Sequence, residues 1–343
     1  MGGFVFRSSG DISMQFVTLL RRLIAAVSFA LAGHSVHAEL PAGLAGGNLR
    51  IVVGFAAGGA ADTVARLYAE ALKDAGFGSI VVENKPGASA RLAWDMVKKS
   101  RPDGLTVFLA PSPLLTLLPL TYKTPGYDAD KDLLPVALVV EIPTAIVTGA
   151  GQDYSNLREY VEWAKRNPKK VSVGLATVGS SGHLGAFALA RAQNFELTPV
   201  LYRGASPMLI DVVGGELSAG WDAVASMMPL YRGGKIKFLG LSGEQRLPTL
   251  PGVPTAKEQG FSEFVPASSW YGIYVPSGTP KAVIAALEKS FLAAAVRPGL
   301  VKSIESAGFV AHAEDGTSTM RRAQRERANW APIVKAAGVV INE

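Results

Sequence analysis

The sequence changes its hydrophobic pattern sharply between Leu49 and Tyr68. The first part, Leu49 to Phe55, is a nearly continuous apolar run of the kind found in a buried parallel strand. After Gly58 and Gly59 the apolar residues recur at helical spacing, at Ala61, Val64, Ala65, Tyr68 and Leu72. A strand that turns through glycines into an amphipathic helix is the repeating unit of α/β proteins. This stretch therefore predicts an α/β fold and fixes the position of its first loop.

The loop of this unit, residues 56–60, carries no bulky side chain. A ligand can approach its backbone closely, at a helix N-terminus whose free N–H groups favour an anion. We expect Ala57, Gly58 and Gly59 to contact such a ligand. A nucleotide is excluded because Ala60 and Ala61 follow where a phosphate-binding loop requires Lys and then Ser or Thr.

Asp62 lies in the first turn of the predicted helix, where its carboxylate has two possible roles. It can accept hydrogen bonds from free N–H groups near Gly59, as the acid of a capping box does. It can also contact the ligand, most simply through an ordered water, because two negative charges repel at close range. Both roles stay open, and capping is favoured because helix first turns are commonly acidic.

Composition limits the chemistry that the chain can perform. The 343 residues are 48% hydrophobic, carry a formal net charge of +6 and include no cysteine. We expect two globular domains without disulfides or thiolate chemistry. A histidine-rich metal site is also excluded, because only His183 and His312 lie outside the N-terminal segment.

The N-terminal segment, residues 1–38, has the features of a secretory signal peptide. Arg21-Arg22 precede an apolar run, and Val36-His37-Ala38 is a small-residue cleavage site; Met14 is an alternative start. We expect export to a periplasm, cleavage after Ala38 and no lipid anchor. Loss of three arginines and one aspartate with this segment lowers the net charge to +4, which suits a small anion and does not require nucleic acid.

The second half of the chain repeats the design of the first loop. Residues 170–176 predict a strand, 177–182 a loop of small residues and 183–194 a helix. Ser180 and Ser181 suit helix capping and ligand contact about equally, because one hydroxyl can cap while the other points outward. Two anion-favouring helix starts in different domains predict a ligand held between them.

Two further polar residues follow predicted strands. Ser112 lies beyond residues 106–109, at the strand end where α/β sheets bind ligands. Asp222 lies near the end of the apolar run 217–224, where a carboxylate needs a partner. That partner is either a nearby backbone N–H group or a donor on the ligand.

Other patterns predict local structure. Glu141-Ile142-Pro143 breaks two apolar runs and marks the first crossing between domains, and Thr255 to Glu258 fits a capping box on the return crossing. Ser206 and Pro207 suit the N-cap and N1 positions of a helix. The arginines of one C-terminal helix predict a solvated face: Arg321, Arg322, Arg325 and Arg327.

Taken in order, several motifs resemble the periplasmic receptors of tripartite tricarboxylate transporters, the Bug or TctC-like family. The resemblance covers the chain from about Leu49 to its end. It is carried by VGFAAGGAADTVAR (53–66), VVENKPGA (81–88), RPDGLT (101–106), VGSSGHL (178–184), YRG (202–204), LPTLPGVPTAKEQG (247–260) and SSWYGIYVPSGTP (268–280).

The resemblance implies a two-domain clamshell binding protein, each domain a mostly parallel sheet flanked by helices, joined by two crossover segments. It divides the chain into residues 39–142 plus 267–343 and residues 143–266. It implies a monomer without catalysis, cofactor or metal, which passes a small carboxylated compound to a membrane permease. The ligand-binding positions that it adds are Thr177, Gly179 and Tyr202, with Ser112 and Asp222 supported again. We also expect His183, at the helix start after this loop, to contact the ligand.

The chain departs from the family pattern at two places. Ser89-Ala90-Arg91 stands where members usually carry Gly-Gly-Asn, and Leu105 where they carry Tyr. Arg91 is then either a cation at the rim of the cleft or a solvated residue at a helix start, and the second is favoured. The departure affects the expected loop shape and ligand more than the family.

Two other functions compete with solute binding. A serine hydrolase could use Ser180 or Ser181 with His183, but His183 occupies the position where a G-x-S-x-G elbow needs glycine, and it lies in the helix start. A receptor that signals to a sensor kinase is the other alternative. The sequence does not identify the carboxylate.

Overall fold

The structure is a computed structural model that describes residues 2–3, 40–41, 43–175, 180–202, 204–243, 245–262 and 268–338. The chain separates into two units, Met1–Glu39 and Leu40–Glu343. The predicted signal peptide, with Met14 and the cleavage site at Ala38, lies outside the described residues. The described helices and strands all lie in the second unit.

The element order alternates strands with helices, as the sequence pattern predicts. The described strands are β1 (Asn48–Val53), β2 (Ser79–Asn84), β3 (Thr106–Pro111), β4 (Leu133–Ile142), β5 (Thr144–Gly149), β6 (Ser172–Leu175), β7 (Thr198–Leu201), β8 (Ala219–Ala223), β9 (Ile236–Leu241), β10 (Ser269–Pro276) and β11 (Glu314–Asp315). The described α-helices are α2 (Ala60–Ala71), α3 (Arg91–Lys98), α4 (Pro113–Thr116), α5 (Leu118–Thr121), α6 (Leu157–Arg166), α7 (Ser181–Ala192), α8 (Ala205–Gly214), α9 (Val224–Arg232), α10 (Lys281–Ala295), α11 (Pro298–Ser306) and α12 (Gly316–Ala337). Two short 3₁₀ turns are η1 (Ala88–Ala90) and η2 (Pro168–Lys170).

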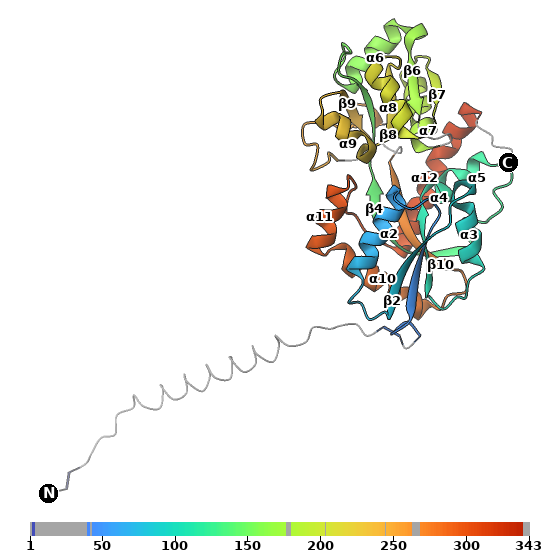
Figure 1. Cartoon of the computed structure of the whole chain (residues 1–343), viewed down its shortest axis with the longest axis vertical. Coiled ribbons are helices and arrows are strands. Elements are labelled where there is room, and N and C mark those ends of the chain that lie inside the picture. Colours follow the sequence, from blue (N-terminus) through green and yellow to red (C-terminus); the bar gives the residue numbers. More distant parts are fainter. Residues whose placement is uncertain are drawn as a thin grey trace. The chain divides into compact units, whose positions relative to one another are not determined.

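These strands form two separate sheets, each flanked by helices (Figure 1). The first has the order β11-β4-β10-β3-β1-β2 and the second the order β7-β6-β8-β5-β9. The predicted α/β fold class is therefore confirmed. One detail differs from the prediction of mostly parallel sheets: β10 runs antiparallel to β3 and β4, and β5 runs antiparallel to β8 and β9. The sheets are mixed because β10 and β5, the strands next to the crossings between the sheets, run opposite to the parallel strands of the βα units.

Side chains that alternate along β1 separate the first core into two layers. Ile51 and Val53 pack into one apolar cluster, and Val52 packs into the other. Helices α2, α10 and α11 cover the first face, and α3, α4 and α12 cover the second (Figure 1). In the second sheet, Ile146 faces α6 and α7, whereas Val147 faces α8 and α9. Each sheet is thus buried on both faces, which explains its nearly continuous apolar strands.

The chain passes from the first sheet to the second at Pro143. β4 ends at Ile142 in the first sheet and β5 begins at Thr144 in the second, with Pro143 between them. On the return, the Glu258 N–H donates to Thr255 Oγ1 (3.1 Å) and the Thr255 N–H donates to Glu258 Oε2 (2.7 Å). This reciprocal pair confirms the capping box.

Two local predictions are wrong. Phe55 does not belong to the buried strand: β1 stops pairing at Val53, and Phe55 lies in the following loop with 39% of its surface exposed. Ser206 and Pro207 are not the N-cap and N1 residues, because α8 begins at Ala205 after Gly204. Pro207 is still accommodated, since first-turn N–H groups have no partner within a helix.

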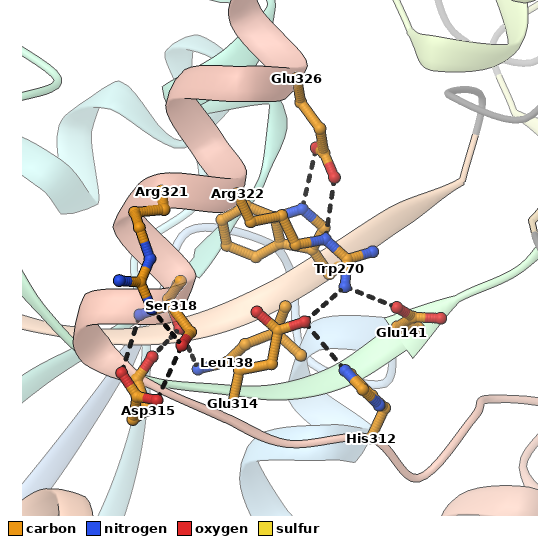
Figure 2. Close-up of polar contacts among 11 residues, drawn as sticks. Leu138, Glu141, Trp270, His312, Glu314, Asp315, Ser318, Arg321, Arg322 and Glu326 are labelled. Carbon is orange, nitrogen blue, oxygen red and sulfur yellow. Dashed lines mark hydrogen bonds and ion pairs between the residues drawn. The ribbon is translucent and has the colours of Figure 1, made fainter.

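The prediction of a solvated arginine face is wrong for two of its four residues. Arg322 is half-buried and pairs with three acids (Figure 2): its NH1 lies 2.7 Å from Glu141 and 2.9 Å from Glu314, and its Nε lies 2.9 Å from Glu326. Arg327 makes a two-pronged contact with Asp130 at 2.6 and 2.8 Å. Arg321 and Arg325 are exposed as predicted. The difference follows from helical geometry, because positions 321 and 325 share a face that 322 and 327 do not.

Candidate functional site

The first candidate loop joins β1 to α2 and is open to solvent. Residues 55–60 are exposed, and Gly58 has a left-handed backbone (φ 81°), with no heavy atom within 4 Å of the point that a Cβ would occupy. Gly59 is the N-cap residue of α2 and has no side chain that could cap the helix. The helix therefore starts with backbone N–H groups beside a loop without bulk, which is the arrangement that favours an anion.

Asp62 caps this loop from within the helix. Its Oδ2 accepts from the Gly58 N–H (2.9 Å) and from Arg66 Nε (2.9 Å). Arg66, with a smaller effect of the Gly58 N–H, lowers the pKa of Asp62 to about 2. The capping interpretation is confirmed, and Arg66 is a partner that sequence reasoning missed although it lies four residues further along the helix. Asp62 Oδ1 is buried and has no hydrogen-bond partner among the described residues.

The second candidate loop precedes α7. Ser180 is the N-cap residue, and its Oγ accepts from the His183 N–H at 3.2 Å. Ser181 and His183 are buried, and burial lowers the pKa of the His183 imidazole. The Ser180 hydroxyl thus caps the helix, as one of the two predicted roles requires. Thr177 and Gly179 lie outside the described residues.

Two further candidates, Ser112 and Asp222, are each bonded within the protein. Ser112 Oγ lies 2.8 Å from Ser269 Oγ and accepts from the Trp270 N–H at 3.3 Å, so it ties the end of β3 to β10. Asp222 accepts from Ser226 Oγ at 2.8 Å, and burial raises the pKa of the Asp222 carboxyl.

Tyr202 has a partner that the sequence did not indicate. Its hydroxyl donates to Asp211 Oδ2 at 2.5 Å, and burial together with Asp211 raises the pKa of Tyr202 to about 12. Asp211 lies one helix later, on α8, and no motif signals this contact. Tyr202 therefore stays protonated and keeps its hydrogen bond throughout the physiological pH range.

The structure brings part of the candidate set together. A Cβ placed on Gly182 would lie 2.9 Å from the ring of Trp221, so the start of α7 packs directly on β8 next to Asp222. Leu184 shares an apolar cluster with Leu114 and Trp270, which flank the Ser112 contact. Within the described residues, no hydrogen bond joins positions 57–62 to Ser112, Tyr202, Asp222 or the start of α7.

The described residues offer little for metal or membrane chemistry. No group of three or more His, Cys, Asp or Glu side chains among them is placed to hold a metal ion. Within the same part of the chain, no helix combines the length and apolarity needed to cross a bilayer.

Comparison with known proteins supplies the family. The model of the tripartite tricarboxylate transporter family receptor (TctC) matches residues 64–339. The chain is similar to the periplasmic binding protein BugD, with 31% identity, 85% of this chain and 98% of that chain covered, and a TM-score of 0.70. It is also similar to MatC from Rhodopseudomonas palustris with bound malate (28% identity, coverage 84% and 98%, TM-score 0.69). R. palustris Rpa4515 with adipate is a further match (27% identity, coverage 85% and 98%, TM-score 0.74).

The family model spans more than half of this chain. The solved structures share the fold of this chain over most of their own length. The predicted resemblance is therefore confirmed. This chain belongs to the tripartite tricarboxylate transporter family of receptors.

Proposed function

We propose that this protein is exported to the periplasm, binds a small mono- or dicarboxylate and delivers it to a membrane permease without converting it. The supporting observation is the start of α2, where a bare Gly58-Gly59 loop is exposed and Gly59 offers no capping side chain. An ionised carboxylate is a suitable ligand for such N–H groups. The binding of malate by MatC and of adipate by Rpa4515 supports the same ligand class.

The proposed site combines this loop with the start of α7, Ser112, Tyr202 and Asp222. Residues 39–142 plus 267–343 form one domain and residues 143–266 the other, so that each loop comes from a different domain. Closure of the domains on one anion then gives each loop a part of the affinity. Cleavage after Ala38 releases the mature receptor.

A serine hydrolase is not proposed. The Ser180 hydroxyl accepts from the backbone N–H of His183, and this is the contact of a helix cap. A nucleophile–base pair requires the serine hydroxyl to donate to the imidazole in addition, and His183 stands where a G-x-S-x-G elbow needs glycine.

Calorimetry and thermal unfolding with L-malate and adipate test the proposed function. A carboxylate that binds only the folded protein must raise the melting temperature, by an amount that grows with ligand concentration. The uncharged diamides of the same two acids are the matched ligands, and they should neither bind nor stabilise. NMR of the recovered ligand should show no conversion. Equal binding of the diamides, or turnover of a carboxylic ester that is lost in Ser181→Ala, would contradict the proposal.

Gly59→Leu tests the loop itself. The Cβ position of Gly59 is no closer than 3.4 Å to its nearest neighbour, and its φ is −81°. The variant protein should therefore fold, while the leucine side chain covers the loop. Gly299→Leu is the matched control, because its Cβ position has no neighbour within 4 Å and it lies in α11. We expect Gly59→Leu to lose affinity for the carboxylate and Gly299→Leu to keep it.

A further inference from the structure

Three consecutive residues without the freedom of glycine adopt a left-handed backbone at Ala88, Ser89 and Ala90. Their φ angles are 47°, 53° and 71°. Elsewhere in the described residues, Asn194 alone among non-glycine residues has a positive φ. L-residues rarely enter this region, and then singly, because Cβ approaches the following carbonyl oxygen. Such a turn persists only where its surroundings hold it.

Arg91 links this turn to Tyr122 and Pro125. Its guanidinium carbon lies 4.2 Å from the centre of the Tyr122 ring, and its Nε donates to the Ala88 carbonyl at 3.0 Å. Its NH1 reaches the Pro125 carbonyl at 3.5 Å. The Tyr122 hydroxyl in turn lies 3.4 Å from Ser89 Oγ. Arg91 and Tyr122 thus hold the turn at its first and second residues.

The turn in its place supports the first candidate loop. Ala90 is only 1% exposed, and a Cβ placed on Gly54 would lie 2.3 Å from the Ala90 methyl. Gly54 is the first residue after β1, where the loop begins. On the other side, Asn84 Nδ2 donates to the Phe55 carbonyl at 3.0 Å. The segment from Asn84 to Ala90 therefore packs against the start of the loop, at Gly54 and Phe55.

We propose that Arg91 is a positioning residue for the anion-binding loop. By stacking on Tyr122 and bonding the Ala88 carbonyl, it holds Ala90 against Gly54 and so fixes the backbone that leads to Gly58. Arg91 acts through the turn and not through its own charge on the ligand. This inference rests on the proposed function, because the loop is taken as the carboxylate site. It also replaces both roles that the sequence suggested for Arg91, a cation at the rim and a solvated side chain.

The test is a glycine rescue measured by calorimetry with whichever of L-malate and adipate binds the wild-type protein. Arg91→Ala should weaken binding by about tenfold, because the strained turn relaxes and the loop loses the contact between Ala90 and Gly54. Adding Ala88→Gly and Ser89→Gly to Arg91→Ala should restore affinity to within about twofold, because glycine adopts positive φ without a clamp. Both residues are exposed, so their side chains contribute little packing. The control is Arg101→Ala, whose side chain is 90% exposed, and it should leave affinity unchanged.

Two further measurements distinguish the positioning role of Arg91 from an effect of its charge on the ligand. Arg91→Lys keeps the charge but loses the planar stacking and the fork of donors, so it should behave like Arg91→Ala. Without ligand, hydrogen exchange of the Gly58 amide should be faster in Arg91→Ala and return towards wild type in the glycine variant.

Unchanged affinity in Arg91→Ala would overturn the inference, and so would a loss that glycine does not rescue but lysine prevents. A wild-type protein that binds neither carboxylate would overturn the proposed function instead. The exchange rates of the Gly58 amide would still show whether Arg91 positions the loop.

Discussion

Replacing Arg322 by methionine should destabilise the protein strongly. The side chain is the shared counter-ion of Glu141, Glu314 and Glu326 (Figure 2). Arg322 is 14% exposed, and the three acids are 16 to 27% exposed. Methionine fills a similar volume but removes the guanidinium that Glu141, Glu314 and Glu326 share, although Glu314 keeps His312 Nε2 at 2.9 Å. Trp270 Nε1, which donates to Glu326 at 3.0 Å, keeps its contact with that acid.

The size of the effect follows from the burial of these charges. Removing one partner of a buried ion pair costs about 3–5 kcal/mol, and because the three acids are partly exposed we expect a loss of about 3 kcal/mol here. For a chain of this length, such a loss lowers the melting temperature by about 5 °C. Arg321→Met is the matched control on the preceding residue, because Arg321 is exposed and donates a hydrogen bond to Ser318. It should change stability by less than about 0.5 kcal/mol.

Urea unfolding of the two variants at two pH values, about 7 and about 4.5, measures this effect. Burial already raises the pKa of Glu326, and loss of Arg322 raises it further. When the pKa of a carboxyl is higher in the folded protein than in the unfolded chain, its protonation stabilises the folded protein at low pH. This contribution to the free energy of unfolding is lost as the pH rises through the folded pKa. The deficit of Arg322→Met should therefore be smaller at the lower pH. Equal stability of the two variants, or a deficit independent of pH, would refute the reasoning.

Three further predictions concern the first loop and the N-terminus. Gly58→Ala should destabilise the protein by about 1 kcal/mol and Gly59→Ala should not, because only Gly58 has a positive φ; thermal unfolding of both variants decides this, and equal effects would contradict it. Asp62→Asn should remove stability that the wild type has above about pH 4 and loses as the pH falls through about 2, since the folded pKa of Asp62 is depressed; acid unfolding curves that coincide would exclude the Asp62 cap. N-terminal sequencing of the exported protein should begin at Glu39, and an uncleaved product would exclude the predicted signal peptide.

The sequence predicted elements whose causes are local. The change from a continuous apolar run to helical spacing placed β1 and α2, and Thr255 with Glu258 specified a capping box, because both patterns act within a few residues. Gly58 could be placed in the first loop for the same reason, since the apolar run breaks locally at Gly58 and Gly59.

Contacts between distant segments could not be predicted from local sequence patterns. Ser112 finds Ser269 at a sequence separation of 157, and Arg322 finds Glu141 on another element, so no local pattern records either pair. The left-handed turn at Ala88 to Ala90 was hidden for a related reason. It contains no glycine to signal a positive φ, and its cause lies in Arg91 and Tyr122.

The central claim is that one carboxylate ligand is held by both loop regions, and a crystal structure of the protein grown with L-malate or adipate tests it most directly. We predict a ligand oxygen about 2.7–3.2 Å from a backbone N–H group within residues 57–61, and a second contact from the start of α7 at Ser180 or Ser181. A ligand that touches only one of these regions, or that lies away from both, would contradict the account.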